Sequence, residues 1–448
     1  MPRYLDELIP SDARSIDVNQ LARLEGLSSS PNPLDVYEEK DEEIERQGLG
    51  PKGYLTQQGL QTLKEYKYAS GFTGATDKYL MIPLWNWCLQ FVPIWMAPNL
   101  LTTMSLACGV ACYFLFQYHS PDFLDVPPSW VFYLTSFLMF FYLILDGLDG
   151  KQARKTGSSS PLGQLFDHGL DAICCFLCGI FISTVLQLGS HRASAIVLVL
   201  HILPFYTSNW EELTTGVMRF GVIGITEGQL FICALLAITG YIGVDAWNTR
   251  VELPKFLADY APSVLKPSLS EPMEYKFILI ALGTVGVMYQ VISSAMSVWE
   301  YHTLHAEERR TAKIYMKAKR MYAHFILFMS AGMAWVWAPS RFFEEHSRIV
   351  LLTIGILFGY QVSRLIISRV TKDPYPFAFL NMVFLPYGLL ILNCWIGEPL
   401  PTYPLSIAYL CLIFLVYAHF AVTTINQICS FLKINCFSIP YPKTKKVQ

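Results

Sequence analysis

Charged residues are scarce in this sequence. Only 15% of its 448 residues are Asp, Glu, Lys or Arg, and 53% are hydrophobic, whereas about a quarter of a soluble domain is charged. The composition excludes an ordinary soluble domain and indicates a membrane protein. An excess of positive charge is also missing, since the net charge is -2. Nucleic acid is therefore not expected as a partner, because a protein that binds the phosphate backbone carries a concentrated basic face.

Neither a disulfide framework nor a cleavable signal peptide is predicted. Most of the 11 cysteines lie inside apolar runs, where cysteine behaves as a small hydrophobic residue, so we expect free thiols. Cys174, Cys175 and Cys178 lack a second pair of ligands at zinc-finger spacing. The first ~50 residues are polar and acidic, which does not match the basic and then apolar pattern of a signal peptide.

The chain divides into five predicted stretches. Residues 1–60 carry Pro, Ser, Glu and Asp without apolar periodicity, which predicts a disordered cytosolic tail. Residues 61–96 form an interfacial segment, because the tryptophans and other apolar residues of 80–95 are interrupted by Pro, Asn and Gln and suit an amphipathic helix in the headgroup layer. Residues 97–246 are expected to hold the catalytic helices, residues 247–430 the later membrane helices, and residues 431–448 a cytosolic tail.

Apolar runs of roughly twenty residues alternate with short polar links after Ala97. This is the length that a hydrocarbon core of about 30 Å requires of a helix. The pattern predicts an all-α polytopic membrane protein with about ten transmembrane helices. The expected spans are 97–117, 129–148, 165–188, 192–210, 228–246, 276–298, 320–339, 347–366, 376–396 and 402–424.

The orientation of the chain follows from its basic residues. Lys and Arg concentrate in the links that are cytosolic if the N-terminus is cytosolic, and an even number of spans then places both termini in the cytosol. The ending Lys445-Lys446-Val447-Gln448 looks like a dilysine retrieval signal, which predicts an endoplasmic reticulum or Golgi membrane. The alternative is that these lysines only follow the same positive-inside bias.

Four aspartates fall at the cytosolic ends of the second and third predicted spans: Asp146, Asp149, Asp167 and Asp171. Spacings of three and four residues place each pair on one helical face. Buried charges of one sign are costly within a membrane, at about 2.5–3.5 kcal/mol each at the bilayer centre. Divalent ions offset this cost, and oxygen-only ligands favour Mg²⁺ or Mn²⁺, with two ions as a known way to clamp a diphosphate. Gly150 and Gly163 let a phosphate or a nucleotide approach the backbone.

The run D-x-x-D-G-x-x-A-R, eight residues, G, three residues, D, three residues, D extends from Asp146 to Asp171 and includes Ala153 and Arg154. It resembles the signature of the CDP-alcohol phosphotransferase family at every position. The wider run 145–171 and residues 97–102 look like its eukaryotic choline- and ethanolaminephosphotransferase branch, and the resemblance covers residues 60 to 440. Features similar to the ethanolamine enzymes are Gly147, Leu170, residues 66–68 and residues 245–247.

The resemblance implies a donor, CDP-ethanolamine or CDP-choline, an acceptor, diacylglycerol or alkylacylglycerol, and the products phospholipid and CMP. The same four aspartates would hold the metal ions. Ala153 belongs to the motif, and Arg154 would meet phosphate or nucleotide. Asn99 and Thr102 would contact the nucleotide, with capping of the first helix as the alternative.

The acceptor hydroxyl needs a base to take its proton. Asp171 is the family's usual candidate, but a metal-bound carboxylate loses basicity. His168 lies three residues earlier on roughly the same helical face and has an ordinary pKa of about 6.5, so we favour it. Glu227 opens the fifth span and would orient that histidine or contact the amine, or else serve as a helix-start carboxylate favoured by the helix dipole.

On this resemblance we favour an ethanolaminephosphotransferase, and several other functions compete with it. Within the family they are a cholinephosphotransferase, a dual enzyme, and an enzyme that uses CDP-diacylglycerol, although the last group usually has about six helices. A cation-coupled transporter also places carboxylates in membrane helices, but here all four lie in one stretch and no repeat symmetry is visible. An inactive scaffold is disfavoured because the signature is intact. A homodimer is expected as one possible assembly.

Overall fold

The computed structural model describes residues 53–66, 74, 76–189, 191–216, 224–252, 254, 271–304 and 309–439. These residues belong to one compact unit, Leu49–Gln448. Helices dominate it, and the described strands are two short ones, β1 (Arg250–Val251) and β2 (Met273–Glu274), which pair antiparallel. The 11 cysteines are free thiols, as predicted. Most of the predicted N-terminal tail and the terminal lysines lie outside the described residues.

Each of the ten predicted spans corresponds to a helix. They are α5 (Pro98–His119), α6 (Ser129–Thr156), α7 (Pro161–Val185), α8 (Ala193–Thr215), α9 (Ile225–Ile242), α13 (Tyr275–Leu304), α14 (Arg309–Val336), α15 (Phe342–Thr371), α16 (Phe377–Trp395) and α17 (Thr402–Leu432), and the short α10 (Asp245–Asn248) follows α9. Within the described residues, eight of the ten are long and apolar enough to cross a membrane; α14 does not qualify, and α16 contributes the shorter apolar stretch Leu380–Trp395. The all-α polytopic fold is therefore confirmed.

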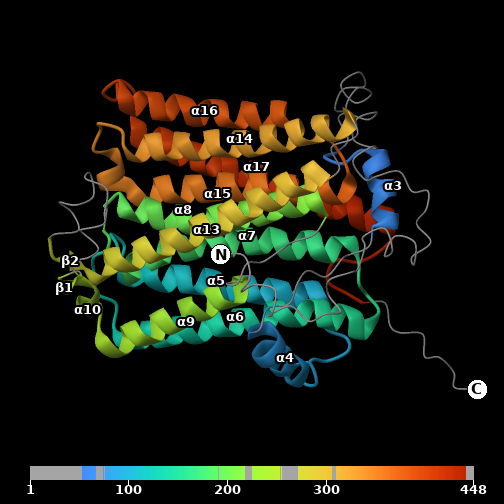
Figure 1. Ribbon diagram of the computed structural model, residues 1–448, viewed down its shortest axis with the longest axis horizontal. Helices are drawn as coiled ribbons and strands as arrows, with labels where there is room; N and C mark the ends of the chain where they lie inside the picture. The colour runs from blue at the N-terminus through green and yellow to red at the C-terminus, as the bar shows by residue number, and fades with distance from the viewer. Residues whose placement is uncertain are drawn as a thin grey trace, which may run out of the picture. The chain divides into compact units, whose positions relative to one another are not determined.

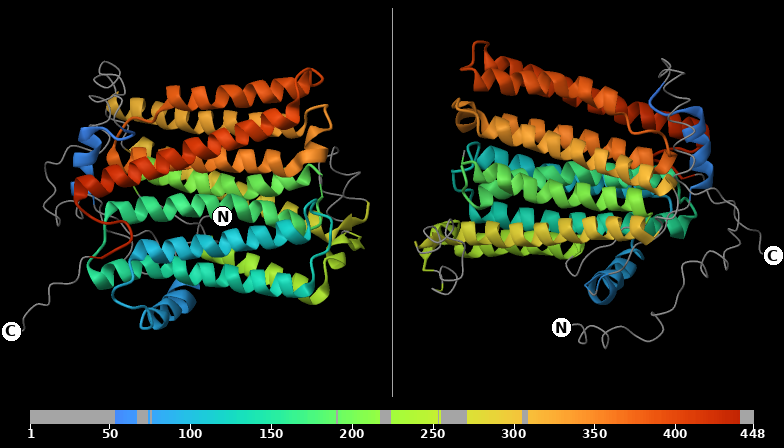
Figure 2. Two further views of the ribbon diagram at one scale, coloured as in Figure 1. Left: turned by 180° about the vertical axis from the view of Figure 1, so that it is seen from behind. Right: turned by 45° about the horizontal axis from the view of Figure 1, so that its top comes forward.

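The long helices run side by side in both views (Figures 1 and 2). Helix α6 packs against α5 and α9, and α7 packs against α5, α8 and α15. Most side chains of α15 are buried, although it belongs to the later membrane helices, outside the stretch 97–246 that was expected to hold the catalytic helices. Its Gly355 lies so close to Phe176 of α7 that a Cβ there would overlap the ring, at 2.4 Å from Cδ2. This late helix therefore supports the helix that carries Asp167 and Asp171.

The predicted interfacial segment contains a π-helix, η2 (Asp77–Met81), followed by α4 (Ile82–Cys88), which lies beside the end of α6 (Figure 1). Trp87, Phe91 and Trp95 are exposed, as expected for a segment in the headgroup layer. Trp85 instead packs on Gly147 of α6, where a Cβ would come within 2.1 Å of its ring. The glycine that resembles the ethanolamine enzymes thus has a packing role.

The N-terminal boundary differs from the prediction. Residues 57–60, expected in the disordered tail, begin helix α3 (Gln57–Glu65). This helix packs against α15 and α17, so residues 61–65 do not belong to an interfacial segment. Thr56 caps it by accepting a hydrogen bond from the Gly59 N–H at 2.8 Å. Its hydroxyl also donates to Asp373 Oδ1 at 2.6 Å. The prediction missed this helix because only two apolar residues, Leu60 and Leu63, are buried along it.

Candidate active site

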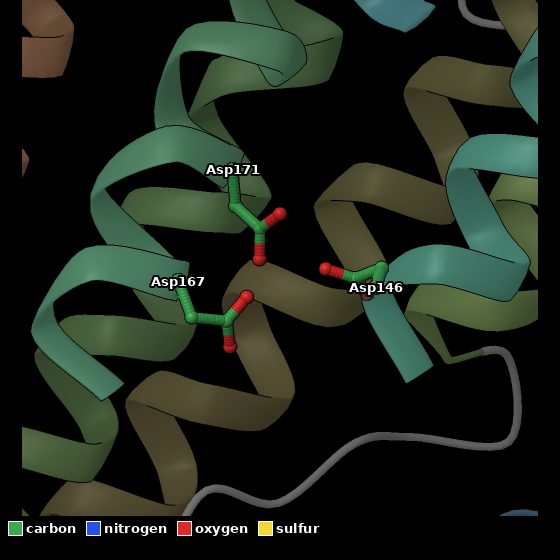
Figure 3. A group of neighbouring side chains, drawn as sticks. All are labelled: Asp146, Asp167 and Asp171. Carbon is green, nitrogen blue, oxygen red and sulfur yellow. The ribbon is translucent and has the colours of Figure 1, made fainter. Parts of the chain in front are cut away.

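The turn between α6 and α7 brings the two aspartate pairs together. Helix α6 ends at Gly157, whose φ of 66° is left-handed, a conformation that glycine adopts at little cost. Helix α7 then starts with Ser160 as its N-cap and Pro161 in its first turn, both typical of a helix start. After this reversal both helices pack against α5, and residues of the end of α6 face residues of the start of α7 (Figure 3).

Three carboxylates meet across this helix pair. Asp146 comes from α6, and Asp167 and Asp171 come from α7 (Figure 3). One oxygen from each lies within 4.8 Å of the others. This arrangement brings together three of the four predicted ligands on facing helices.

The fourth predicted ligand, Asp149, lies outside this three-carboxylate group. It is buried, and its Oδ2 accepts a hydrogen bond from the Thr102 hydroxyl at 2.7 Å. Thr102 also donates to the Pro98 carbonyl, so its hydroxyl serves both the start of α5 and the aspartate. Thr102 therefore joins the site by positioning Asp149, a contact that neither sequence alternative included.

The oxygens of the three-carboxylate group fit a divalent ion. Oδ1 of Asp146 and Oδ1 of Asp167 are buried and have no hydrogen-bond partner among the described residues. Unpaired buried acceptors are costly. Asp171 is held from the other side by the Tyr142 hydroxyl, which donates to its Oδ1 at 2.5 Å. The donor set is made of oxygens alone, which favours Mg²⁺ or Mn²⁺ over zinc.

The remaining motif residues surround the group. A Cβ on Gly150 would meet only the Arg154 guanidinium, at 3.7 Å, and a Cβ on Gly163 would meet Asn99 Oδ1 at 3.8 Å. Both glycines therefore leave room beside the carboxylates. Arg154 is exposed and Ala153 is half-buried. Asn99 is buried, and its amide nitrogen donates to the backbone carbonyl of Cys436, which follows α17, at 3.0 Å.

His168 is held by a residue to which the sequence assigned no role. Its Nδ1 lies 3.4 Å from Oδ1 of Asn209 on α8. The amide nitrogen of Asn209 donates to the Phe205 carbonyl, so the Asn209 side chain presents its oxygen to the ring. That oxygen only accepts, and it therefore favours the tautomer with the proton on Nδ1. Nε2 is left as the basic nitrogen. His168 and Asn209 are 41 positions apart in the sequence, and no local sequence pattern indicates that they meet.

Glu227 begins α9. Its Oε2 accepts a hydrogen bond from the Gly224 N–H at 2.8 Å, which is the capping alternative. Its neighbour Thr226 donates to Asp77. None of the described contacts of Glu227 joins it to His168, and its catalytic role stays a prediction.

Comparison with known proteins points to one family. Residues 95–248 match the family described as CDP-alcohol phosphatidyltransferase. A Dictyostelium discoideum protein named "Uncharacterized CDP-alcohol phosphatidyltransferase class-I family protein 2" is 30% identical, over 88% of this chain and 90% of its own length. An Arabidopsis thaliana protein, choline/ethanolaminephosphotransferase 1, is 29% identical over 86% of this chain and 98% of its own. Human ethanolaminephosphotransferase 1 is 28% identical over 87% and 96%.

Proposed function

The chain belongs to the CDP-alcohol phosphatidyltransferase class-I family, and on that premise we propose that it is an ethanolaminephosphotransferase. It transfers phosphoethanolamine from CDP-ethanolamine to diacylglycerol or alkylacylglycerol and releases CMP. The observation that carries the proposal is the group of Asp146, Asp167 and Asp171. Buried oxygens of Asp146 and Asp167 lack a partner among the described residues and suit the divalent metal that the transfer of a phosphate ester requires. The human ethanolaminephosphotransferase among the relatives supports this head group.

The reaction needs one proton acceptor. The acceptor hydroxyl oxygen attacks the β-phosphorus, the bond from that phosphorus to the oxygen of CMP breaks, and CMP leaves. The hydroxyl proton passes to Nε2 of His168, which the Asn209 contact leaves unprotonated. Asp171 is less suited to this step, because its carboxylate belongs to the metal group and accepts from Tyr142. Two bound Mg²⁺ or Mn²⁺ ions would neutralise the diphosphate charge.

The other site residues have supporting roles in this proposal. Asp149, held by Thr102, completes the ligand set with the three grouped carboxylates. Arg154, which is exposed, meets the diphosphate. Gly150 and Gly163 leave room for the donor beside the carboxylates. The small side chain of Ala153 does the same on the adjacent turn of α6. Glu227 contacts the amine of the head group.

The class of reaction is tested by CMP release. Purified protein is incubated with diacylglycerol, Mg²⁺ or Mn²⁺, and CDP-ethanolamine or CDP-choline. We expect metal-dependent CMP release that chelation abolishes and that falls by roughly 10³ or more in Asp146→Ala and Asp149→Ala. The exposed Asp125 gives a matched control, because Asp125→Ala removes the same group from a loop at the other end of the helices. Absence of CMP from both donors, with folded wild-type protein, contradicts the proposal.

Two related questions are answered by the same assay. The Arabidopsis relative is named for both head groups, so comparable rates with the two donors would identify a dual enzyme. His168→Gln should lower kcat by about 10² or more without raising the KM of the donor, because it removes a general base. An unchanged kcat would indicate that Asp171, not His168, takes the proton of the acceptor hydroxyl.

Localisation belongs to the same proposal. We place the protein in the endoplasmic reticulum or Golgi membrane with both termini in the cytosol. The eight described helices that are suited to spanning make it a multi-pass membrane protein. Accessibility of an epitope fused to each terminus after selective permeabilisation of the plasma membrane tests the orientation. A homodimer is tested by the mass of the purified protein in detergent.

A further inference from the structure

Residues 85–96 form a segment between the end of α6 and the surface of the protein. They comprise the second half of α4 and the turns that lead to α5, which begins at Pro98. Figure 1 shows α4 outside the row of long helices and beside α6. Most of the segment precedes the family match at 95–248.

One face of the segment follows a single stripe of α6. Trp85 Nε1 donates to the Leu143 carbonyl at 3.2 Å, and the Trp85 ring lies on Gly147. Lys151 Nζ donates to Asn86 Oδ1 at 2.8 Å. The α6 residues of this contact recur every four positions and so share one helical face. They are Leu143, Gly147, Lys151 and Lys155.

Two side chains of α6 hold the backbone of the segment. Gln152 Nε2 and Lys155 Nζ each donate to two of its carbonyls, at distances between 2.8 and 3.1 Å. The four carbonyls belong to Leu89, Val92, Pro93 and Met96. Gln152 is fully buried. If the segment moved away, its amide would lose both acceptors, and a buried donor without a partner costs about 1–3 kcal/mol.

The same stretch of α6 carries Asp146 and Asp149. Asp149 accepts its hydrogen bond from Thr102 of α5, and the segment leads directly into α5. The segment therefore contacts the helix of Asp149 and precedes the helix of Thr102. A movement of the segment reaches both partners of that hydrogen bond.

Another face of the segment is apolar and exposed. Its exposed side chains are Trp87, Phe91, Ile94 and Trp95. Large aromatic side chains of this kind insert into the headgroup layer of a bilayer. Lys155, which is exposed, adds a positive charge next to this face that suits lipid phosphates. The partner that fits both features is a lipid surface, and insertion is easiest where the headgroups are loosely packed.

We propose that residues 85–96 respond to lipid packing and thereby set the activity of the site. In a loosely packed leaflet the aromatic side chains insert, and the segment stays against α6. In a tightly packed leaflet they are excluded, the segment leaves α6, and Gln152 and Lys155 lose their carbonyl partners. The turn of α6 that carries Asp149 then loses its support, and catalysis falls. This inference goes beyond the proposed function and uses its reaction as one readout.

Activity in vesicles tests the response to packing. Full-length protein is placed in vesicles of dioleoyl phosphatidylcholine, which pack loosely, or of palmitoyl-oleoyl phosphatidylcholine with cholesterol, which pack tightly, at one fixed fraction of diacylglycerol. We expect kcat for CMP release to be about threefold or more higher in the loose vesicles. Phe91→Ala removes a ring that is 68% exposed, with little risk to folding, and should hold kcat at the low value in both.

Phe114→Ala is the matched control. Phe114 lies on α5, outside this segment, and is similarly exposed, at 61%. The variant should keep the wild-type response, because it leaves the segment intact. Equal kcat of the wild type in the two kinds of vesicle overturns the proposal. A response that persists unchanged in Phe91→Ala also overturns it.

Lys155 is a positioning residue in this proposal, and its replacement tests the link to α6. Lys155→Met keeps most of the apolar stem but cannot donate to the segment. We expect kcat to fall about tenfold in both kinds of vesicle, with the KM of the donor little changed and the response to packing lost. Lys155→Arg keeps the donors and should restore both.

Lys78→Met is the control for loss of charge at the same surface. Lys78 is exposed in η2 and lies over the ring of its neighbour Tyr79, so its removal leaves the contacts with α6 in place. It should retain the wild-type kcat and response. Equal losses in Lys78→Met and Lys155→Met would show a general effect of surface charge and overturn the proposal.

Hydrogen exchange separates this proposal from the proposed function, because it needs no turnover. The amides of Phe91, Val92 and Met96 are followed in the two kinds of vesicle. Slower exchange in loose vesicles that Lys155→Met abolishes supports the proposal even if wild-type protein released no CMP. Exchange that is the same in both vesicles, in an enzyme that releases CMP, overturns the response to packing and leaves the proposed function standing.

Discussion

At the scale of single residues, the site depends on which atom of each side chain faces inward. Asn209 uses its NH₂ on the Phe205 carbonyl and so gives its oxygen to His168. Thr102 gives its hydroxyl to Asp149, and Tyr142 gives its own to Asp171. Each contact orients a group that the motif identifies. A catalytic group contributes to the rate only when its reacting atom is correctly oriented.

Replacement of Asn209 tests the assigned tautomer. Asn209→Leu removes the acceptor of the His168 Nδ1–H, so the ring is free to place its proton on Nε2. We expect kcat for CMP release to fall about tenfold or more, with the KM of the donor and the unfolding temperature little changed. Asn209→Asp keeps an acceptor at this position and should retain most of the activity. Equal kcat in Asn209→Leu and wild type would contradict the assignment.

At the scale of elements, helix α3 and the residues beside it form hydrogen bonds with the C-terminal helices. Its N-cap, Thr56, is bonded both to its own helix and to Asp373 beyond α15. The backbone N–H of Tyr54 donates to Gln427 of α17. At the other end of α3, Tyr66 reaches α7. One short helix thus links three long ones near the aspartates.

Thr56→Val removes the cap and one partner of a buried carboxylate. We expect this change to lower the free energy of local opening of α3 by about 1–3 kcal/mol. Faster hydrogen exchange at the Gly59 and Leu63 amides would report it. Thr62→Val makes the same change on the same helix, where the Thr62 hydroxyl only donates to the Gln58 carbonyl, and should have little effect. Equal exchange in the two variants would contradict the role of Thr56.

At the scale of the whole molecule, the later helices pack against the helices of the candidate active site. Helix α15 packs against α7 and α8, the helices of His168 and Asn209. The C-terminal segment after α17 holds Asn99. The family match at 95–248 therefore covers the motif but neither α15 nor the segment that holds Asn99.

Gly355→Val tests this dependence. Its side chain would overlap Phe176, five residues after Asp171, and would force α7 and α15 apart. We expect a loss of about 1–3 kcal/mol of stability from overpacking, together with loss of CMP release. Gly388→Val on α16 is the control, because a Cβ there meets nothing within 4 Å. Normal unfolding temperature and activity in Gly355→Val would show that α15 does not support the site.

The sequence determined what depends on neighbours along the chain. Apolar run length predicted the ten helices, and the spacing of Asp146, Asp149, Asp167 and Asp171 placed two pairs of carboxylates at facing helix ends, because helical periodicity is local. Only the tertiary structure decided that α15 lies in the core, that Asn209 meets His168, and that Cys436 orients Asn99. These contacts join residues that are far apart in the sequence. They depend on where single polar atoms point, and the periodicity of the sequence does not determine this.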